Sequence, residues 1–278
     1  MPVPKLKNLT ILVLLLANLC LALVVFPSRA GIRREEDALR QSLSDLYARQ
    51  EISLSPQIIP DTASLYVLEL TESSESDLQA ALILLGEQLL VQDDSTRYLS
   101  AFRSSLGQCS ISRSGEFSAQ LNQSKAVRDP QRACEKLLKD MGFSHLPLQE
   151  PQQHSNGSYT ITATQTILDI PIFSRGLTFT WENGCLTTLD GVFFTNTDTL
   201  KRVSDKACLS AADALVHFLD AAYDLGWVGS ELLSIRQGYI RSETATATAV
   251  RLTPVWQLET DTGSFQIHGM TGDVMPIT

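Results

Sequence analysis

The feature that most constrains this chain is an uncharged, strongly apolar run near its N-terminus. Residues Leu9–Phe26 read LTILVLLLANLCLALVVF, which is 18 residues without a charged side chain. As a helix rising about 1.5 Å per residue, this run spans most of the roughly 30 Å hydrocarbon core of a bilayer, where a helix satisfies its own backbone. The sequence therefore predicts a transmembrane helix at residues 9–26, preceded by a cytoplasmic tail at residues 1–8.

The orientation of this segment depends on the rest of the chain, because lysines and arginines flank it on both sides. The short N-terminal tail and the large acidic remainder favour a cytoplasmic N-terminus. We thus expect a single-pass protein of the cell membrane whose C-terminal domain lies outside the cytoplasm. A cleaved signal peptide is the alternative, since Ser28-Arg29-Ala30 carries small residues at positions −3 and −1, but the length of the apolar run favours a retained anchor.

The composition is that of a globular protein, with 44% hydrophobic and 19% charged residues in 278. A net charge of −9 repels phosphate backbones, which argues against nucleic acid as a partner and leaves the N-terminal helix as the contact with lipid. The four histidines are scattered and form no metal-binding motif, and neither G-x-S-x-G nor S-x-x-K occurs. The sequence predicts no enzyme activity, no cofactor and no bound metal. A cell-wall enzyme with an unrecognised motif is the remaining alternative.

A second helix is predicted directly after the apolar run, over residues 34–50. Its apolar side chains share one helical face: Leu39, Leu43, Leu46 and Tyr47. The favoured interpretation is a solvated helix that packs on its own domain, and the alternative is a pairing surface for a helix of another membrane protein. Pro56 and Pro60 then break the helix, so residues 27–61 are predicted to be a juxtamembrane helix and linker.

The strongest organisational signal after the apolar run is an internal near-repeat. Each copy begins with an amphipathic helix that stops at a glycine and continues into strand-like segments. Gly142 lies 29 residues before Pro171, and Gly226 lies 28 residues before Pro254. Each proline is followed by an aliphatic residue, an aromatic residue and then a glycine-containing turn. Such turns join antiparallel strands, because glycine and asparagine accept positive φ.

The simplest architecture for such copies is a helix packed on one face of a three- or four-stranded antiparallel sheet. The predicted fold class is therefore α+β: an N-terminal transmembrane helix followed by two or three helix-plus-antiparallel-sheet repeats. The expected boundaries are an N-terminal α+β subdomain at residues 62–125, a first repeat at 126–200 and a second at 201–278. Pro171 and Pro254 are expected at strand starts or edges, since neither can donate to a ladder.

Four cysteines follow the apolar segment: Cys109, Cys134, Cys185 and Cys208. An even number in an oxidising compartment allows two disulfides, with three alternative pairings. No pair has the C-x-x-C spacing of zinc or thiol-redox sites. Disulfide bridges and buried free thiols are both consistent with this pattern.

The C-terminal part carries a resemblance to a known family. Leu252–Gly263, LTPVWQLETDTG, contains a Pro-aliphatic-Trp strand that runs into a hairpin, and Thr271-Gly272-Asp273-Val274 closes the last hairpin. Both segments resemble the terminal strands of PepSY-type extracytoplasmic domains. With the start Lys5–Ile11, KLKNLTI, and one apolar anchor, the chain resembles YycI and its relative YycH. These are membrane-anchored accessory proteins of a Gram-positive two-component system that controls cell-wall metabolism. The four outer cysteines are not part of that pattern.

The resemblance implies a non-enzymatic, membrane-anchored extracytoplasmic regulator that associates with a membrane sensor histidine kinase and modulates its activity. A paralogous accessory protein is implied as a further partner. The candidates for partner contact through helix packing are Asn18, Ala17, Ala22, Leu39, Leu43 and Leu46. In hydrocarbon, the Asn18 amide seeks a partner across a helix interface or bonds its own helix backbone. The alternative function is a PepSY-like binding or protease-inhibitory module that the membrane segment only tethers.

Overall fold

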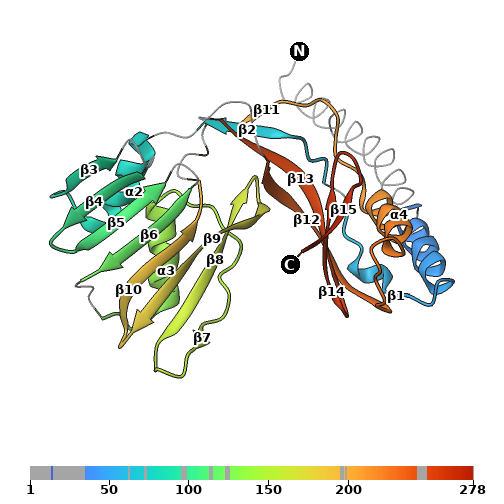
Figure 1. Cartoon of the computed structure of the whole chain (residues 1–278), viewed down its shortest axis with the longest axis horizontal. Helices are drawn as coiled ribbons and strands as arrows, with labels where there is room; N and C mark the ends of the chain where they lie inside the picture. The colour runs from blue at the N-terminus through green and yellow to red at the C-terminus, as the bar shows by residue number, and fades with distance from the viewer. Residues whose placement is uncertain are drawn as a thin grey trace, which may run out of the picture.

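The computed structural model describes Leu14 and residues 35–277, with gaps at residues 62, 72–73, 95–98, 113–114, 123–125, 195–196, 198 and 243–248. Strands dominate this described part, and they are arranged in two lobes (Figure 1). The central lobe is formed by the middle of the chain, residues 74–193. The terminal lobe is formed by the segments on either side, residues 35–71 and 199–277.

The central lobe is built on an antiparallel sheet. Its strands are β3 (Leu90–Asp94), β4 (Leu99–Ser104), β5 (Gly107–Ser112), β6 (Glu116–Leu121), β7 (Gln152–Gln153), β8 (Tyr159–Ile167), β9 (Ile170–Glu182) and β10 (Cys185–Val192). Their order across the sheet is β3-β4-β5-β6-β10-β9-β8-β7. Helices α2 (Ser74–Leu85) and α3 (Pro130–Asp140) pack on one face and lie behind the strands in Figure 1. The opposite face is covered by no helix of the described chain.

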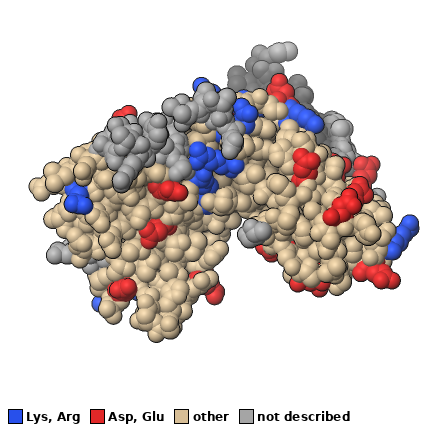
Figure 2. Space-filling view, viewed as in Figure 1, with Lys and Arg blue, Asp and Glu red and all other residues tan. Residues whose placement is uncertain are grey.

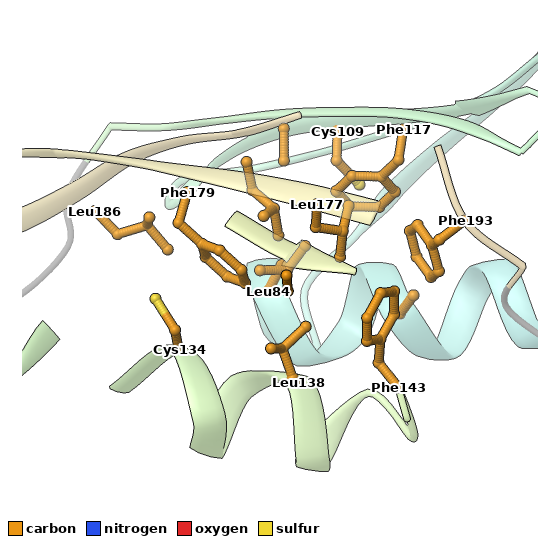
Figure 3. Packing of buried hydrophobic residues seen from close by; sticks show 14 of the residues in the cluster. Leu84, Cys109, Phe117, Cys134, Leu138, Phe143, Leu177, Phe179, Leu186 and Phe193 are labelled. Atoms are coloured by element: carbon orange, nitrogen blue, oxygen red, sulfur yellow. The ribbon is translucent and has the colours of Figure 1, made fainter. Parts of the chain in front are cut away.

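Alternation along the strands directs every second side chain toward these two helices. Asp129 caps α3 by accepting a backbone hydrogen bond within its first turn. Cys134 and Leu138 of α3 then face Phe179 of β9, and α2 closes the core alongside (Figure 3). Burial of each large apolar side chain contributes about 1.5–3 kcal/mol. This face is therefore the core of the lobe, and polar residues occupy the other face.

The terminal lobe is a sheet around one long strand pair, β12 and β13. Its strands are β1 (Ser53–Leu54), β2 (Leu68–Thr71), β11 (Lys201–Arg202), β12 (Glu231–Ser242), β13 (Ala249–Thr260), β14 (Gly263–His268) and β15 (Val274–Ile277), with the 3-10 helix η1 (Pro56–Ile58) after β1. β12 lies along one edge of β13, whereas β2 and β14 share the other edge and β15 follows β14. Helix α4 (Ala211–Ala222) and a helix over residues 35–48 cover one face (Figure 1).

The two lobes are joined where β9 begins. Ile172 of β9 pairs in parallel with Tyr239 of β12, and both side chains are buried. Gly238 permits this approach, because a Cβ there would lie 2.5 Å from Phe173 Cε2 and 2.8 Å from the Pro171 oxygen. A buried cluster from β2, β8, β9, β12 and β13 surrounds the joint. One fifteen-stranded sheet thus runs through the described part of both lobes.

The predicted fold class was wrong. The described chain forms one large mixed sheet with a few short helices, instead of two or three separate helix-plus-antiparallel-sheet repeats. Each near-repeat does give a helix and a three-stranded meander, α3 with β8-β9-β10 and α4 with β12-β13-β14. Further strands pair with the edges of each meander, such as β6 with β10 and β2 with β13. An open strand edge with unpaired N–H and C=O groups gains hydrogen bonds by such pairing.

The boundaries differ from the expected ones for the same reason. Residues 62–125 are divided between the lobes, because β2 pairs with β13 whereas β6 pairs with β10. The segment expected to be a linker belongs to the terminal lobe. In it, β1 pairs with β12, and Leu54 and Ile59 are buried against α4 and the sheet. The polypeptide therefore starts in the terminal lobe, passes through the central lobe and returns.

The two repeat prolines differ in position. Pro171 lies at the second position of β9, as expected for a strand start, whereas Pro254 lies in the middle of β13. The outer edge of β13 is divided at that point, since pairing with β2 ends at Leu252 and pairing with β14 begins at Val255. In this break the Pro254 oxygen accepts a hydrogen bond from the Gly269 N–H at 2.8 Å. The missing N–H of proline therefore interrupts neither ladder.

No helix within the described ranges is long and apolar enough to cross a membrane. The predicted transmembrane helix at residues 9–26 lies outside those ranges, except for Leu14, which is helical and exposed. The predicted cytoplasmic tail at residues 1–8 lies outside them as well.

Replacement of Gly238 by valine is expected to loosen the joint between the lobes. The new side chain meets the Phe173 ring and the Pro171 oxygen, so Gly238→Val should lower the free energy of unfolding by about 1–3 kcal/mol. Urea unfolding followed by circular dichroism measures the change. Leu233→Val, at an exposed position of the same strand, is the matched control and should change stability by less than about 0.5 kcal/mol. Equal stability of the two variants would contradict the close contact.

Candidate functional site

Helix 35–48 carries three of the six predicted partner-contact residues. Leu43 is 6% exposed and packs with Tyr47 against α4, so it belongs to the core of the terminal lobe. Leu39 and Leu46 are 51% and 36% exposed, and their spacing of seven residues places them on the same side of the helix. The other three candidates lie outside the described residues: Asn18, Ala17 and Ala22.

Side-chain hydrogen bonds from Tyr47 and Ser44 fasten helix 35–48 to the terminal lobe. The Tyr47 side chain is fully buried, and its hydroxyl donates to the Leu215 oxygen of α4 at 2.7 Å. Ser44 Oγ donates to the Leu54 oxygen at 2.7 Å, which ties the helix to β1. Burial, and to a lesser degree the negative charge of Asp220, raises the pKa of Tyr47 well above its ordinary value. The folded protein therefore contains Tyr47 with a neutral, protonated hydroxyl.

All four cysteines of the described chain are free thiols. Cys109 and Cys134 are buried in the central core, where burial raises the pKa of each thiol to about 12. Cys208 is half-buried and accepts a hydrogen bond from Gln237 Nε2 at 2.9 Å, and Cys185 is half-buried at the start of β10. In the parts of the chain that the structure describes, no three His, Cys, Asp or Glu side chains gather to hold a metal ion.

A hollow lies on the open face of the central sheet, opposite α2 and α3, and is called the polar groove below. Its volume is about 580 Å³, within the range of about 300–1,000 Å³ typical of ligand sites. Two rows of side chains cross its floor, and each row consists of directly paired residues on neighbouring strands. The first row is Leu90, Arg103, Gln108, Gln120 and Thr188, and the second is Gln92, Ala101, Ser110, Ser118 and Asp190.

Hydrogen bonds order the floor of the polar groove. Gln108 Nε2 donates to Gln120 Oε1 at 3.3 Å, and Ser118 Oγ donates to Asp190 Oδ1 at 2.7 Å. Among the described lining residues only Arg103 and Asp190 are charged, and they stand on β4 and β10. Figure 2 shows the same face, on which most side chains of the central lobe are uncharged. The groove therefore suits recognition by hydrogen bonds, with one charge of each sign.

A second hollow, of about 610 Å³, lies at the N-terminus of α3. Arg128 and Tyr159 contribute to its wall, and Tyr159 stacks on Trp181 with ring centroids 6.4 Å apart. The N-terminus of α3 is already capped by the chain itself, since the Arg132 N–H donates to Asp129 Oδ1 at 3.0 Å. The polar groove is the better candidate site, because its two rows of side chains face the hollow together.

The chain shows no match to any protein-family model and no significant match to a curated protein. The resemblance to YycI and YycH therefore depends on the quoted sequence segments alone. What that resemblance implies about function and partners stays a prediction.

Sequence reasoning missed the polar groove. Its residues come from short alternating strands, GQCSIS in β5 and EFSAQL in β6, whose outward side chains are serine and glutamine, with Glu116 at the start of β6. That alternation indicates half-buried strands but does not show which strands are neighbours. The Ser118–Asp190 contact joins residues 72 positions apart, and no local signal gives this pairing.

The thiols are expected to fall into two classes of reactivity. In the folded protein Cys109 and Cys134 should react slowly with an aromatic disulfide reagent even at pH 9, because burial keeps both thiols protonated. Cys185 and Cys208 should react faster. After denaturation without reductant all four should titrate as thiols, counted in a variant in which Cys20 is replaced by serine. A loss of two titratable thiols would reveal a disulfide and contradict the structure.

Removal of the Tyr47 hydroxyl should change how stability depends on alkaline pH. The folded-state pKa of Tyr47 is raised, so its contribution is fully present below the unfolded-state value of about 10 and is lost as the pH rises above it. The wild-type chain should therefore lose more stability than Tyr47→Phe between about pH 9 and pH 11. Urea unfolding across this range measures the difference. Parallel pH profiles would contradict the burial of the phenol.

Proposed function

We propose that this chain is a non-enzymatic regulator that associates with a membrane sensor histidine kinase of a cell-wall two-component system and modulates its activity. It is attached to the cell membrane through residues 9–26, with the N-terminus in the cytoplasm and both lobes outside. The observation that carries the proposal is the exposed pair Leu39 and Leu46 on the helix that follows this apolar segment. A paralogous accessory protein is a further partner in this proposal.

Leu39 and Leu46 have the geometry of a helix-packing seam. A spacing of seven residues returns to the same side of a helix after two turns, as in coiled coils. Single exposed leucines are common on protein surfaces, but two at heptad spacing next to an apolar segment provide an apolar strip. If a helix of a membrane partner continues outward from the bilayer, this strip lies next to it and can pack against it. This supports contact close to the membrane surface.

The neighbouring side of helix 35–48 is fixed to the terminal lobe by Leu43 and Tyr47. A partner docked on the exposed strip therefore contacts an element that is packed directly on α4. Displacement of that element would be transmitted to α4 and to the sheet beneath it, because packed elements move as units. This supports a role in which the outer domain changes the state of a membrane partner.

The polar groove supports a second candidate function, a PepSY-like extracytoplasmic binding or protease-inhibitory module that residues 9–26 only tether. The groove belongs to the central lobe, whereas helix 35–48 belongs to the terminal lobe. Binding through the groove would therefore not depend on Leu39 or Leu46. A soluble fragment for testing this function has to begin near residue 35, because Leu43 and Tyr47 complete the terminal core.

Two carboxylates placed on the exposed strip are expected to abolish the association. Leu39→Glu with Leu46→Glu should reduce recovery of the kinase about tenfold or more, when the tagged full-length chain is purified from gently solubilised membranes and its partners are identified by mass spectrometry. Gln41→Glu with Ala48→Glu adds the same charges on the opposite, exposed side of the helix and should keep the kinase bound.

Equal recovery of the kinase with both double variants would contradict the proposed contact. Recovery of a protease or a wall enzyme with both variants, without a kinase, would favour the second candidate function.

A further inference from the structure

We propose that the polar groove binds a short extended peptide with free ends, its C-terminal carboxylate at Arg103 and its N-terminal ammonium at Asp190. The peptide has four or five residues and ends in an apolar residue. This inference goes beyond the regulatory function proposed above and does not depend on it, because it concerns the central lobe alone.

The positions of Arg103 and Asp190 set the length of the ligand. In the strand order β4-β5-β6-β10 three inter-strand steps separate the two residues, and they lie in neighbouring rows, two residues apart along the strands. At about 4.8 Å per step and about 3.3 Å per residue, their Cα atoms are about 16 Å apart. An extended peptide also gains about 3.3 Å per residue, so the two ends of a pentapeptide have about this separation.

Between the two charges the floor offers both donors and acceptors to peptide groups. The hydrogen bond between Gln108 and Gln120 uses one atom of each amide, which leaves the Gln108 oxygen as an acceptor and the Gln120 nitrogen as a donor. The hydroxyls of Ser110 and Thr188 can donate and accept. A peptide backbone has the same alternation of N–H and C=O groups. The floor is therefore complementary to a peptide without demanding a particular side chain in the middle.

The two ends of the groove differ, and this difference fixes the direction of the peptide. Leu90 pairs directly with Arg103 and is 74% exposed on the edge strand β3. An arginine beside an exposed leucine suits a chain end that has both a carboxylate and an apolar side chain. At the other end Ser118 donates to Asp190 Oδ1, which orients the carboxylate and leaves Oδ2 for an ammonium group. Ala101 lies two residues from Arg103 on β4, and its small side chain leaves room for the ligand at this end.

Other ligand classes fit the polar groove less well. A phosphate group could bind one arginine, Arg103, and would be repelled by the carboxylate of Asp190. A divalent cation prefers several oxygen ligands with carboxylates among them, and Asp190 is the one carboxylate in the described lining. Phe102 is the one aromatic residue in the described lining, and it is buried on the core side and offers no surface for stacking.

Isothermal titration calorimetry tests the proposal with the full-length chain in detergent micelles and the pentapeptide Gly-Ser-Gln-Ser-Leu. We expect saturable one-to-one binding that Arg103→Gln or Asp190→Asn weakens about tenfold or more. Both side chains are exposed, so unchanged circular dichroism should confirm that the variants fold. Arg236→Gln, at an exposed arginine of the terminal lobe, is the matched control and should bind the peptide like the wild-type chain.

Blocking each end of the peptide separates the two charged contacts. The N-acetylated peptide should bind wild-type and Asp190→Asn chains equally weakly, and the C-amidated peptide should bind wild-type and Arg103→Gln chains equally weakly. Failure of the free pentapeptide to bind, or equal binding of the free pentapeptide by the wild-type, Arg103→Gln and Asp190→Asn chains, would overturn the proposal. Full binding of a peptide with both ends blocked would overturn it too.

Discussion

The structure depends on the antiparallel pairing of β12 with β13. In the terminal lobe β1 pairs with the outer edge of β12, and β2 and β14 pair with the outer edge of β13. β9 of the central lobe also pairs with the outer edge of β12. β11 and β15 are attached through β2 and β14. Trp256 of β13 is fully buried beneath α4 and donates its indole N–H to the Leu209 oxygen at 3.0 Å, which fixes the helix to the pair. The central lobe enters the same network through Tyr239 and Gly238. The apolar core and the joint between the lobes therefore have a common support.

Those parts of the fold that depend on local signals could be predicted from the sequence. Gly142 and Gly226 lie in the turns that follow α3 and α4 and have φ of 69° and 67°, and the Asn183-Gly184 turn also has positive φ at both residues. The helix and the three-stranded meander of each near-repeat could be predicted from these glycine and asparagine turns. The completion of the sheets could not be predicted, because β2 and β13 lie far apart in the sequence and pairing depends on which edges meet. Pro254 shows the limit, since its place in mid-strand is allowed only by the break between β2 and β14.

The candidate surfaces divide in the same way. The amphipathic pattern of residues 34–50 gave the helix and its leucines, but not which leucines remain exposed. Leu43 is buried against α4, whereas Leu39 and Leu46 are exposed. The angle at which the helix packs on the lobe determines which leucines are buried. The polar groove had no motif at all. Its chemistry arises when five strands place ordinary serine, threonine and glutamine side chains in two rows, between one arginine and one aspartate.

The central claim is that helix 35–48 is a structural part of the terminal lobe and connects the N-terminal chain to the β12–β13 pair. Hydrogen exchange of the full-length chain, followed by mass spectrometry, tests this most directly. Amides at residues 43–54 should exchange as slowly as those of α4, because Tyr47, Ile52 and Leu54 share the same core. Exchange of these amides at the rate of an unfolded peptide, with α4 still protected, would contradict the claim.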